Sequence, residues 1–157
     1  TVNTSYQAIK KPDVIYAFDR RWWKEYSDQV PKCEKWCGDK WSSVEYDLRY
    51  IKVENGNGLS TNQNILHSGK NSGYQAINLA YHLGAKNIYL IGYDMKSGGE
   101  HWHGKHPKNW GNSEGANKWA RLFNDLAKDL EEKQVNVINC TIDTAITCFK
   151  QGALDEL

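Results

Sequence analysis

The stretch "GYDMKSGGEHWHGKHP", residues 92–107, combines several side chains that could do chemistry. Its three histidines, His101, His103 and His106, lie within six positions, and they follow an apolar run that ends at Asp94. An imidazole titrates close to neutral pH and can therefore act as a general acid or base. One of these histidines is a candidate catalytic base, and Asp94 is a candidate ligand contact beside it.

The same histidines allow two other interpretations. His101 and His103 are two residues apart, so they would point to one side of an extended segment, where His106 could join them. Three imidazoles around an open fourth position are typical of catalytic zinc, with Asp94 as fourth ligand or as a group that orients a histidine. A plain surface loop is the remaining alternative, because loop geometry does not fix where these side chains point.

The segment "KNSGYQA" predicts the start of a helix. Asn71 or Ser72 can cap it, and the backbone N–H groups of Ser72 and Gly73 would then lie at the positive end of the helix dipole. Such an end binds phosphate or carboxylate, and the neighbouring Lys70 favours an anion. An ordinary capped helix explains the same residues, because the full glycine-rich nucleotide-binding patterns are absent.

Two N-terminal motifs are further candidates. Asn3 lies at the rim of a sheet if Val2 ends a strand, and it could bond a base or a ribose there. In "FDRRWW", Arg20 or Arg21 could clamp a phosphate, and Trp22 could stack on a base or sugar. A solvated helix start with buried tryptophans fits this second motif equally well.

Apolar periodicity predicts strands and helices in alternation. The expected strands are residues 13–18, 44–54, 87–93 and 135–140, of which 87–93 is expected to be buried on both faces. The expected helices are residues 19–30, 71–84 and 113–133, with a short last helix or turn from residue 144. This order implies an α/β sandwich with a mostly parallel sheet, formed by one domain over residues 1–157. Ligands of such sheets bind at the carboxyl ends of the strands, where we expect the motifs above.

Composition narrows the range of partners. The net charge is +1 and 25% of the residues are charged, so no global field selects nucleic acid or an anionic membrane. No apolar run approaches the roughly 20 residues of a membrane span. We expect a small-molecule ligand, and a homodimer is possible through Trp36 and Trp41. The chain opens without a methionine, which suggests a processed or truncated product.

The cysteines do not have the spacing of a zinc ribbon. They are Cys33, Cys37, Cys140 and Cys148. We expect reduced thiols in a cytoplasm. Cys33 and Cys37 could face each other one helical turn apart.

The segment "NSGYQAINLAYHLGAKNIYLIGYDM", followed by "HWHGKHP", resembles a group of small tailed-bacteriophage proteins. The stretches "NTSYQAIKKPDVIYAFDRRWW" and "VINCTIDTAITCF" extend that resemblance over nearly the whole chain. More remotely, the chain is similar to a superfamily that includes bacterial sialyltransferases using CMP-sialic acid, motility-accessory-factor proteins and archaeal pterin diphosphokinases. The resemblance implies a Rossmann-like three-layer sandwich, and a phage-encoded protein in the host cytoplasm.

The resemblance also implies roles for individual residues. Carried over by position, the nucleotide contacts are Asn3, Ser72, Gly73 and Asp94. The catalytic base is one of the three loop histidines, with His103 favoured because Gly104 lets a substrate approach. The superfamily's first strand and its Gly-x-Gly-Pro-Ser phosphate loop have no counterpart before residue 1. Either the chain is a fragment, or this version of the fold lacks that strand.

The function that we expect is glycosyl transfer from a nucleotide or nucleotide-sugar donor. A loop histidine would take the proton of the acceptor hydroxyl, and the turn at Asn71, Ser72 and Gly73, with Arg20 or Lys70, would stabilise the leaving phosphate. One alternative is a metal-dependent nucleotide phosphotransferase or hydrolase, in which Asp94 and the histidines hold a divalent ion. Another is a non-catalytic phage accessory protein that binds a nucleotide.

Overall fold

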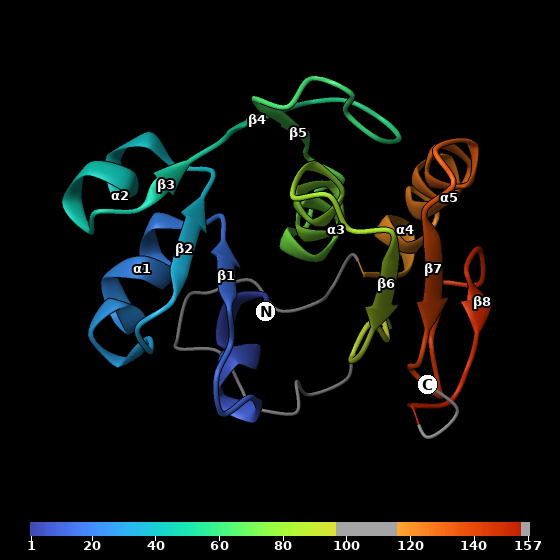
Figure 1. The fold of residues 1–157 in the computed structure, drawn as a ribbon, viewed down its shortest axis with the longest axis horizontal. Coiled ribbons are helices and arrows are strands. Elements are labelled where there is room, and N and C mark those ends of the chain that lie inside the picture. Colours follow the sequence, from blue (N-terminus) through green and yellow to red (C-terminus); the bar gives the residue numbers. More distant parts are fainter. Residues whose placement is uncertain (97–115, 155–157) are drawn as a thin grey trace. The chain divides into compact units, whose positions relative to one another are not determined.

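A computed structural model describes residues 1–96 and 116–154. Within these ranges the protein is mixed α/β, with five α-helices, two short 3-10 helices and eight strands in three small sheets (Figure 1). The chain divides into two compact units. Unit 1 contains residues 1–56 and 60–79, and unit 2 contains residues 57–59 and 80–157. The single domain expected from the sequence stays a prediction.

Unit 1 consists of parallel strands connected mostly through helices. Its elements are η1 (Asn3–Ala8), β1 (Val14–Ala17), α1 (Arg20–Tyr26), η2 (Ser27–Gln29), β2 (Glu34–Cys37), α2 (Lys40–Glu45), β3 (Arg49–Tyr50), β4 (Lys52–Glu54), β5 (Ile65–His67) and most of α3 (Ser72–His82). β2 pairs with β1 and β3, and β4 pairs with β5, all in parallel. Val2 adds a parallel bridge to Tyr16. Ile51 alone separates β3 from β4, so one extended run pairs first with β2 and then with β5.

The core of unit 1 lies between these strands and α3. Tyr16, Ile51, Leu66 and Leu79 are buried together, and the smaller Ala76 packs beside them. Ala76 and Leu79 are about one turn apart on α3 and therefore lie on the same face, which packs against the strands. Gly84, the last residue of the helix predicted over residues 71–84, has a φ of +90°, the left-handed conformation typical of a glycine that ends a helix.

Unit 2 contains a second parallel sheet. Its elements are the end of α3, β6 (Asn87–Leu90), α4 (Ala116–Ala120), α5 (Phe123–Glu132), β7 (Asn136–Asn139) and β8 (Lys150–Gln151). β7 pairs in parallel with both β6 and β8. One face of α5 is apolar and buried, as the periodicity of residues 113–133 predicts: Phe123, Leu126 and Leu130 are all buried. The ring of Phe123 meets the ring of Phe149 edge to face at 6.3 Å.

Two predicted elements of unit 1 were wrong in part. The expected strand over residues 44–54 begins only at Arg49, because residues 44 and 45 belong to α2. That helix forms because the Asp39 carboxylate accepts a hydrogen bond from the Ser42 N–H at 2.7 Å. Cys33 and Cys37 do not lie on a helical turn, since residues 34–37 form β2. The Cys37 thiol instead donates to the Asp39 carbonyl at 3.2 Å.

Unit 2 also departs from the predictions. The helix expected over residues 113–133 is interrupted at residues 121–122, which separate α4 from α5, and residues 113–115 lie outside the described ranges. The strand expected over residues 87–93 ends at Leu90, and its burial alternates: Ile88 and Leu90 are buried while Tyr89 is 43% exposed. Of the helix or turn expected from residue 144, the helix does not form, and the chain bends there on its way into β8. Among the described residues, no helix is both long and apolar enough to cross a bilayer.

Candidate functional site

Asn3 lies at the carboxyl end of the parallel arrangement in unit 1, as predicted. It directly follows Val2, which bridges Tyr16 of β1 in parallel, and it adopts a left-handed backbone with a φ of +47°. A left-handed asparagine turns the chain sharply out of the strand direction. The loops after β1 and β2 leave at the same edge of this sheet, because their strands are parallel. Ligands of parallel sheets bind at this edge.

The predicted helix start at residues 71–73 is confirmed in detail. Asn71 Oδ1 accepts a hydrogen bond from the Tyr74 N–H at 2.8 Å, and Asn71 Nδ2 donates to the Gly69 carbonyl at 2.7 Å. The amide of Asn71 therefore caps α3, and Ser72 and Gly73 begin the eleven-residue helix. The turn that leads into it from β5 includes Lys70, with a φ of +58°. Both the oxygen and the nitrogen of the Asn71 side chain are thus bonded within the turn and the start of the helix.

A buried pair that the sequence analysis missed connects β1 to the start of α3. The Tyr16 hydroxyl donates to Gln75 Oε1 at 2.7 Å, and Gln75 Nε2 donates to the Ser68 carbonyl at 2.9 Å. Burial raises the pKa of Tyr16 well above its ordinary value of 10.0, so the phenol remains a donor. The signal in the sequence was a glutamine on the inner side of the predicted helix, where it is 3% exposed.

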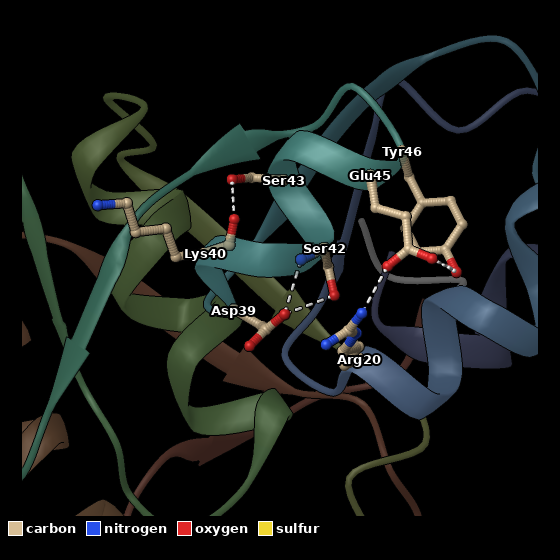
Figure 2. A network of polar contacts seen from close by, with 7 residues as sticks. All are labelled: Arg20, Asp39, Lys40, Ser42, Ser43, Glu45 and Tyr46. Carbon is tan, nitrogen blue, oxygen red and sulfur yellow. Dashed lines mark hydrogen bonds and ion pairs between the residues drawn. The ribbon is translucent and has the colours of Figure 1, made fainter.

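Arg20 is held within unit 1 by an ion pair. Its Nη2 atom donates to Glu45 Oε2 at 3.0 Å, and the Tyr46 hydroxyl donates to the other oxygen of that carboxylate at 3.2 Å. Figure 2 shows this contact between the start of α1 and the end of α2, beside the Asp39 cap. A phosphate at Arg20 would have to compete with Glu45. The predicted phosphate clamp stays a prediction.

Trp22, which was considered as a stacking surface, lies in the interior of unit 1. It is 2% exposed, and its indole N–H donates to Thr4 Oγ1 at 3.2 Å. Its ring meets Tyr6 edge to face at 6.1 Å and lies 5.3 Å from the Tyr26 ring. Trp22 therefore offers no stacking surface, and its burial agrees with the alternative of a helix start with buried tryptophans.

His67 was not singled out from the sequence, although it ends β5 directly before the turn into α3. A Cβ atom at Gly56 would lie 2.5 Å from the His67 ring, so the imidazole packs against the Gly56 backbone. This contact explains why a glycine is needed at position 56. His67 is only partly buried, and it is the last residue of β5, the strand whose carboxyl end leads through the turn to Ser72 and Gly73.

Asp94 lies beyond the carboxyl end of β6 in unit 2 and its side chain is exposed. Its backbone is fixed: the Ala145 N–H donates to the Asp94 carbonyl at 2.7 Å, and the Tyr93 N–H donates to Thr141 Oγ1 at 2.9 Å. The Thr144 hydroxyl donates to the Tyr93 carbonyl at 2.5 Å. The segment after β7 thus holds the segment after β6, and the Asp94 carboxylate extends into solvent.

Asn139, at the end of β7, organises that holding segment and was also missed. Its side chain is fully buried, and Oδ1 accepts a hydrogen bond from the Thr141 N–H at 3.0 Å. Its Nδ2 donates to Thr144 Oγ1 at 3.3 Å and to the Ile146 carbonyl at 3.4 Å. The signal in the sequence was a polar residue at an inward position of the apolar run "VNVINC".

The predicted catalytic or metal-binding histidines, His101, His103 and His106, lie outside the described residues. Within the described ranges no group of three or more His, Cys, Asp or Glu side chains is arranged to hold a metal ion. The divalent ion stays a prediction. The cysteines are free thiols, and burial raises the pKa of both Cys37 and Cys148 to about 11, so neither is a ready nucleophile at neutral pH.

Comparison of the chain with models of known families, with curated proteins and with solved structures finds no match. Asn3 and the start of α3 belong to unit 1, and Asp94 belongs to unit 2.

Proposed function

We propose that the protein binds a nucleotide or nucleotide-sugar donor and transfers its glycosyl group, as do the bacterial sialyltransferases that its sequence resembles. The complete Rossmann-like three-layer sandwich belongs to this proposal. The parallel pairing of the described strands supports it, since ligands of parallel sheets bind at the carboxyl ends. A phage origin, the host cytoplasm and a homodimer belong to the same proposal.

The start of α3 is the observation that carries this proposal. It follows a parallel strand through a tight turn, and Asn71 uses its side chain to cap Tyr74, the third residue of the helix. In the described residues the Ser72 N–H has no hydrogen-bond partner, and it lies in the first turn of an eleven-residue helix. Such N–H groups attract phosphate through both hydrogen bonding and the helix dipole.

Each remaining contact would have a defined part in the reaction. Asn3 would bond the base or ribose, and Asp94 would accept hydrogen bonds from the donor. The acceptor hydroxyl would attack the anomeric carbon, and its proton would pass to one of the loop histidines. The bond from the anomeric carbon to the phosphate oxygen would break, and the Ser72 N–H, with Gly73 next to it, would stabilise the departing phosphate. Lys70, exposed beside them, would add a positive charge.

Binding can be tested by calorimetric titration of the full chain with CMP, UDP, GDP and ADP, and with their sugar derivatives. We expect one nucleotide class to bind. Ser72→Pro removes a single N–H at the first helical position, where proline is tolerated, so the helix should remain. Loss of one hydrogen bond to a charged group should weaken binding by about tenfold or more. The matched control is Ser72→Ala, which keeps the N–H and should bind normally.

The outcomes separate the parts of the proposal. If none of these compounds binds, the nucleotide-binding function is wrong. If Ser72→Pro and Ser72→Ala behave alike, the phosphate does not lie at the start of α3. Product analysis with the bound nucleotide sugar and a panel of glycan acceptors then tests transfer, and tight binding without any product would favour the non-catalytic accessory protein.

A further inference from the structure

We propose that Asn139, Thr141 and Thr144 are positioning residues that fix the backbone of Asp94 before a ligand arrives. We call these three residues the Asn139 clamp. The identity of the ligand rests on the proposed function, whereas the clamp itself rests on contacts within unit 2. All of its members lie in the segment at and after the end of β7, and they act on the segment after β6.

The buried amide of Asn139 gives the clamp its shape. Asn139 is 0% exposed, and both ends of its amide are bonded to the segment that follows it. Oδ1 accepts from the Thr141 N–H, while Nδ2 donates to Thr144 Oγ1 and to the Ile146 carbonyl. A buried amide left unpaired would be costly, so this side chain favours one conformation of the segment.

The two threonine hydroxyls transmit that conformation to Tyr93. Thr141 Oγ1 accepts from the Tyr93 N–H at 2.9 Å, and Thr144 Oγ1 donates to the Tyr93 carbonyl at 2.5 Å. Thr144 Oγ1 also accepts from the Ile146 N–H at 3.0 Å and from Asn139 Nδ2. One donated and two accepted hydrogen bonds use the whole capacity of a hydroxyl. The orientation of the Thr144 hydroxyl is therefore determined.

Asp94 follows this fixed residue and is itself held through its carbonyl, which accepts from the Ala145 N–H at 2.7 Å. The residues near it have left-handed backbones, with a φ of +76° at Gly92 and +47° at Met95. A non-glycine residue rarely adopts that conformation unless its surroundings impose it. Beyond Met95, Lys96 forms an ion pair with Asp143 of the holding segment. The backbone is thus fixed on both sides of an exposed carboxylate.

This arrangement prepares Asp94 for binding. When the loop is ordered before the ligand binds, binding does not include the free-energy cost of ordering it, so affinity rises without any additional contact. The clamp residues need not touch the ligand themselves. Their effect on binding should therefore depend on the presence of the Asp94 carboxylate.

A comparison of Thr144→Val with Thr144→Ser tests the clamp without a ligand. Valine keeps the shape but removes the hydroxyl, whereas serine restores it. Amide hydrogen exchange followed by NMR should be faster at Tyr93 and Ala145, whose N–H groups bond from one segment to the other. The expected increase in Thr144→Val is about tenfold or more, because all three hydrogen bonds of the hydroxyl are lost, and exchange in Thr144→Ser should stay close to the wild type. Thr147→Val, at an exposed position of the same segment, is the control. Unchanged exchange in Thr144→Val would overturn the clamp.

A double-mutant cycle with Asp94→Ala tests its role in binding. We expect Thr144→Val to weaken binding of the nucleotide found by calorimetry in the wild type and to have no further effect in Asp94→Ala. An equal loss in both backgrounds would show that Thr144 acts on the fold in general and would overturn the positioning role. If the wild type binds no nucleotide, the proposed function fails, and the exchange measurement alone decides whether the clamp exists.

Discussion

The two units present chemical groups in opposite ways. In unit 1 two of the predicted polar side chains are already bonded within the unit: Asn71 caps α3 and Arg20 pairs with Glu45. At the start of α3 the group left for a ligand is therefore the backbone N–H of Ser72. In unit 2 the backbone around Asp94 is held by Thr141 and Thr144, so the group left for a ligand is a side chain. A residue type that suits a ligand can therefore serve the fold instead, and only the bonded partners show which.

The largest effect on the free energy of unfolding is expected at Gly58 in unit 2, where the Asp129 side chain lies against the glycine and bonds the next residue. Asp129 of α5 accepts the Leu59 N–H at 2.8 Å, and a Cβ atom at Gly58 would lie 1.9 Å from the same carboxylate oxygen. Gly58→Ala should lower the free energy of unfolding by about 1–2 kcal/mol for its left-handed backbone. Displacing Asp129 from the Leu59 N–H should add about 1–3 kcal/mol. Urea unfolding monitored by circular dichroism measures the sum.

Gly84→Ala is the matched control for this experiment. Gly84 also has a positive φ, +90°, but nothing lies within 4 Å of a Cβ placed there. Its substitution should therefore show only the backbone contribution. Equal losses in the two variants would mean that the Asp129 bond does not stabilise unit 2.

The buried pair in unit 1 should give the next largest effect. Tyr16→Phe leaves Gln75 Oε1 without its donor at 2.7 Å, which should lower the free energy of unfolding by about 1–3 kcal/mol. Tyr50→Phe, at a tyrosine that is 43% exposed, should cost less than about 0.5 kcal/mol. Urea unfolding compares the two, and equal small losses would contradict a role for the Tyr16 bond.

The same pair predicts a pH dependence. Burial raises the pKa of Tyr16 above its ordinary value of 10.0, so the unfolded phenol ionises before the folded one. Its contribution to stability should be complete below pH 10.0 and decline as the pH rises above that value. Tyr16→Phe should lose less stability over this alkaline range than the wild type does. A parallel decline in both proteins would show that other groups cause it.

The sequence predicted the helix caps and the amphipathic stripe because these depend on neighbouring residues. Asn71 and Gly84 act within one turn of α3, and the burial of Leu126 follows from the helical period. The partners of Arg20 and Gln75 could not be predicted, since they lie 25 and 59 residues away along the chain. The spacing of residues along the chain does not show which distant group the fold brings into contact with a given side chain. Alternating residues also misled the prediction at 44–48, where the Asp39 cap favours α2 over a strand.

The smallest effect on stability and on binding is expected for substitution of Arg20. This experiment tests whether a bonded side chain of unit 1 is unavailable to a ligand. The side chains of Arg20 and Glu45 are 55% and 45% exposed, and an ion pair in such a setting contributes about 0–1 kcal/mol, less at high salt. Arg20→Ala should therefore change the free energy of unfolding only slightly, and Lys24→Ala on the same helix is the control. Because Glu45 already neutralises this arginine, Arg20→Ala should leave nucleotide affinity within about twofold of the wild type, a change of less than about 0.5 kcal/mol. A loss of about tenfold in calorimetry would mean that a phosphate displaces Glu45, since tenfold corresponds to about 1.4 kcal/mol. In that case a side chain of unit 1 that is bonded within the fold would also bind the ligand, and the contrast with the exposed Asp94 carboxylate of unit 2 would no longer hold.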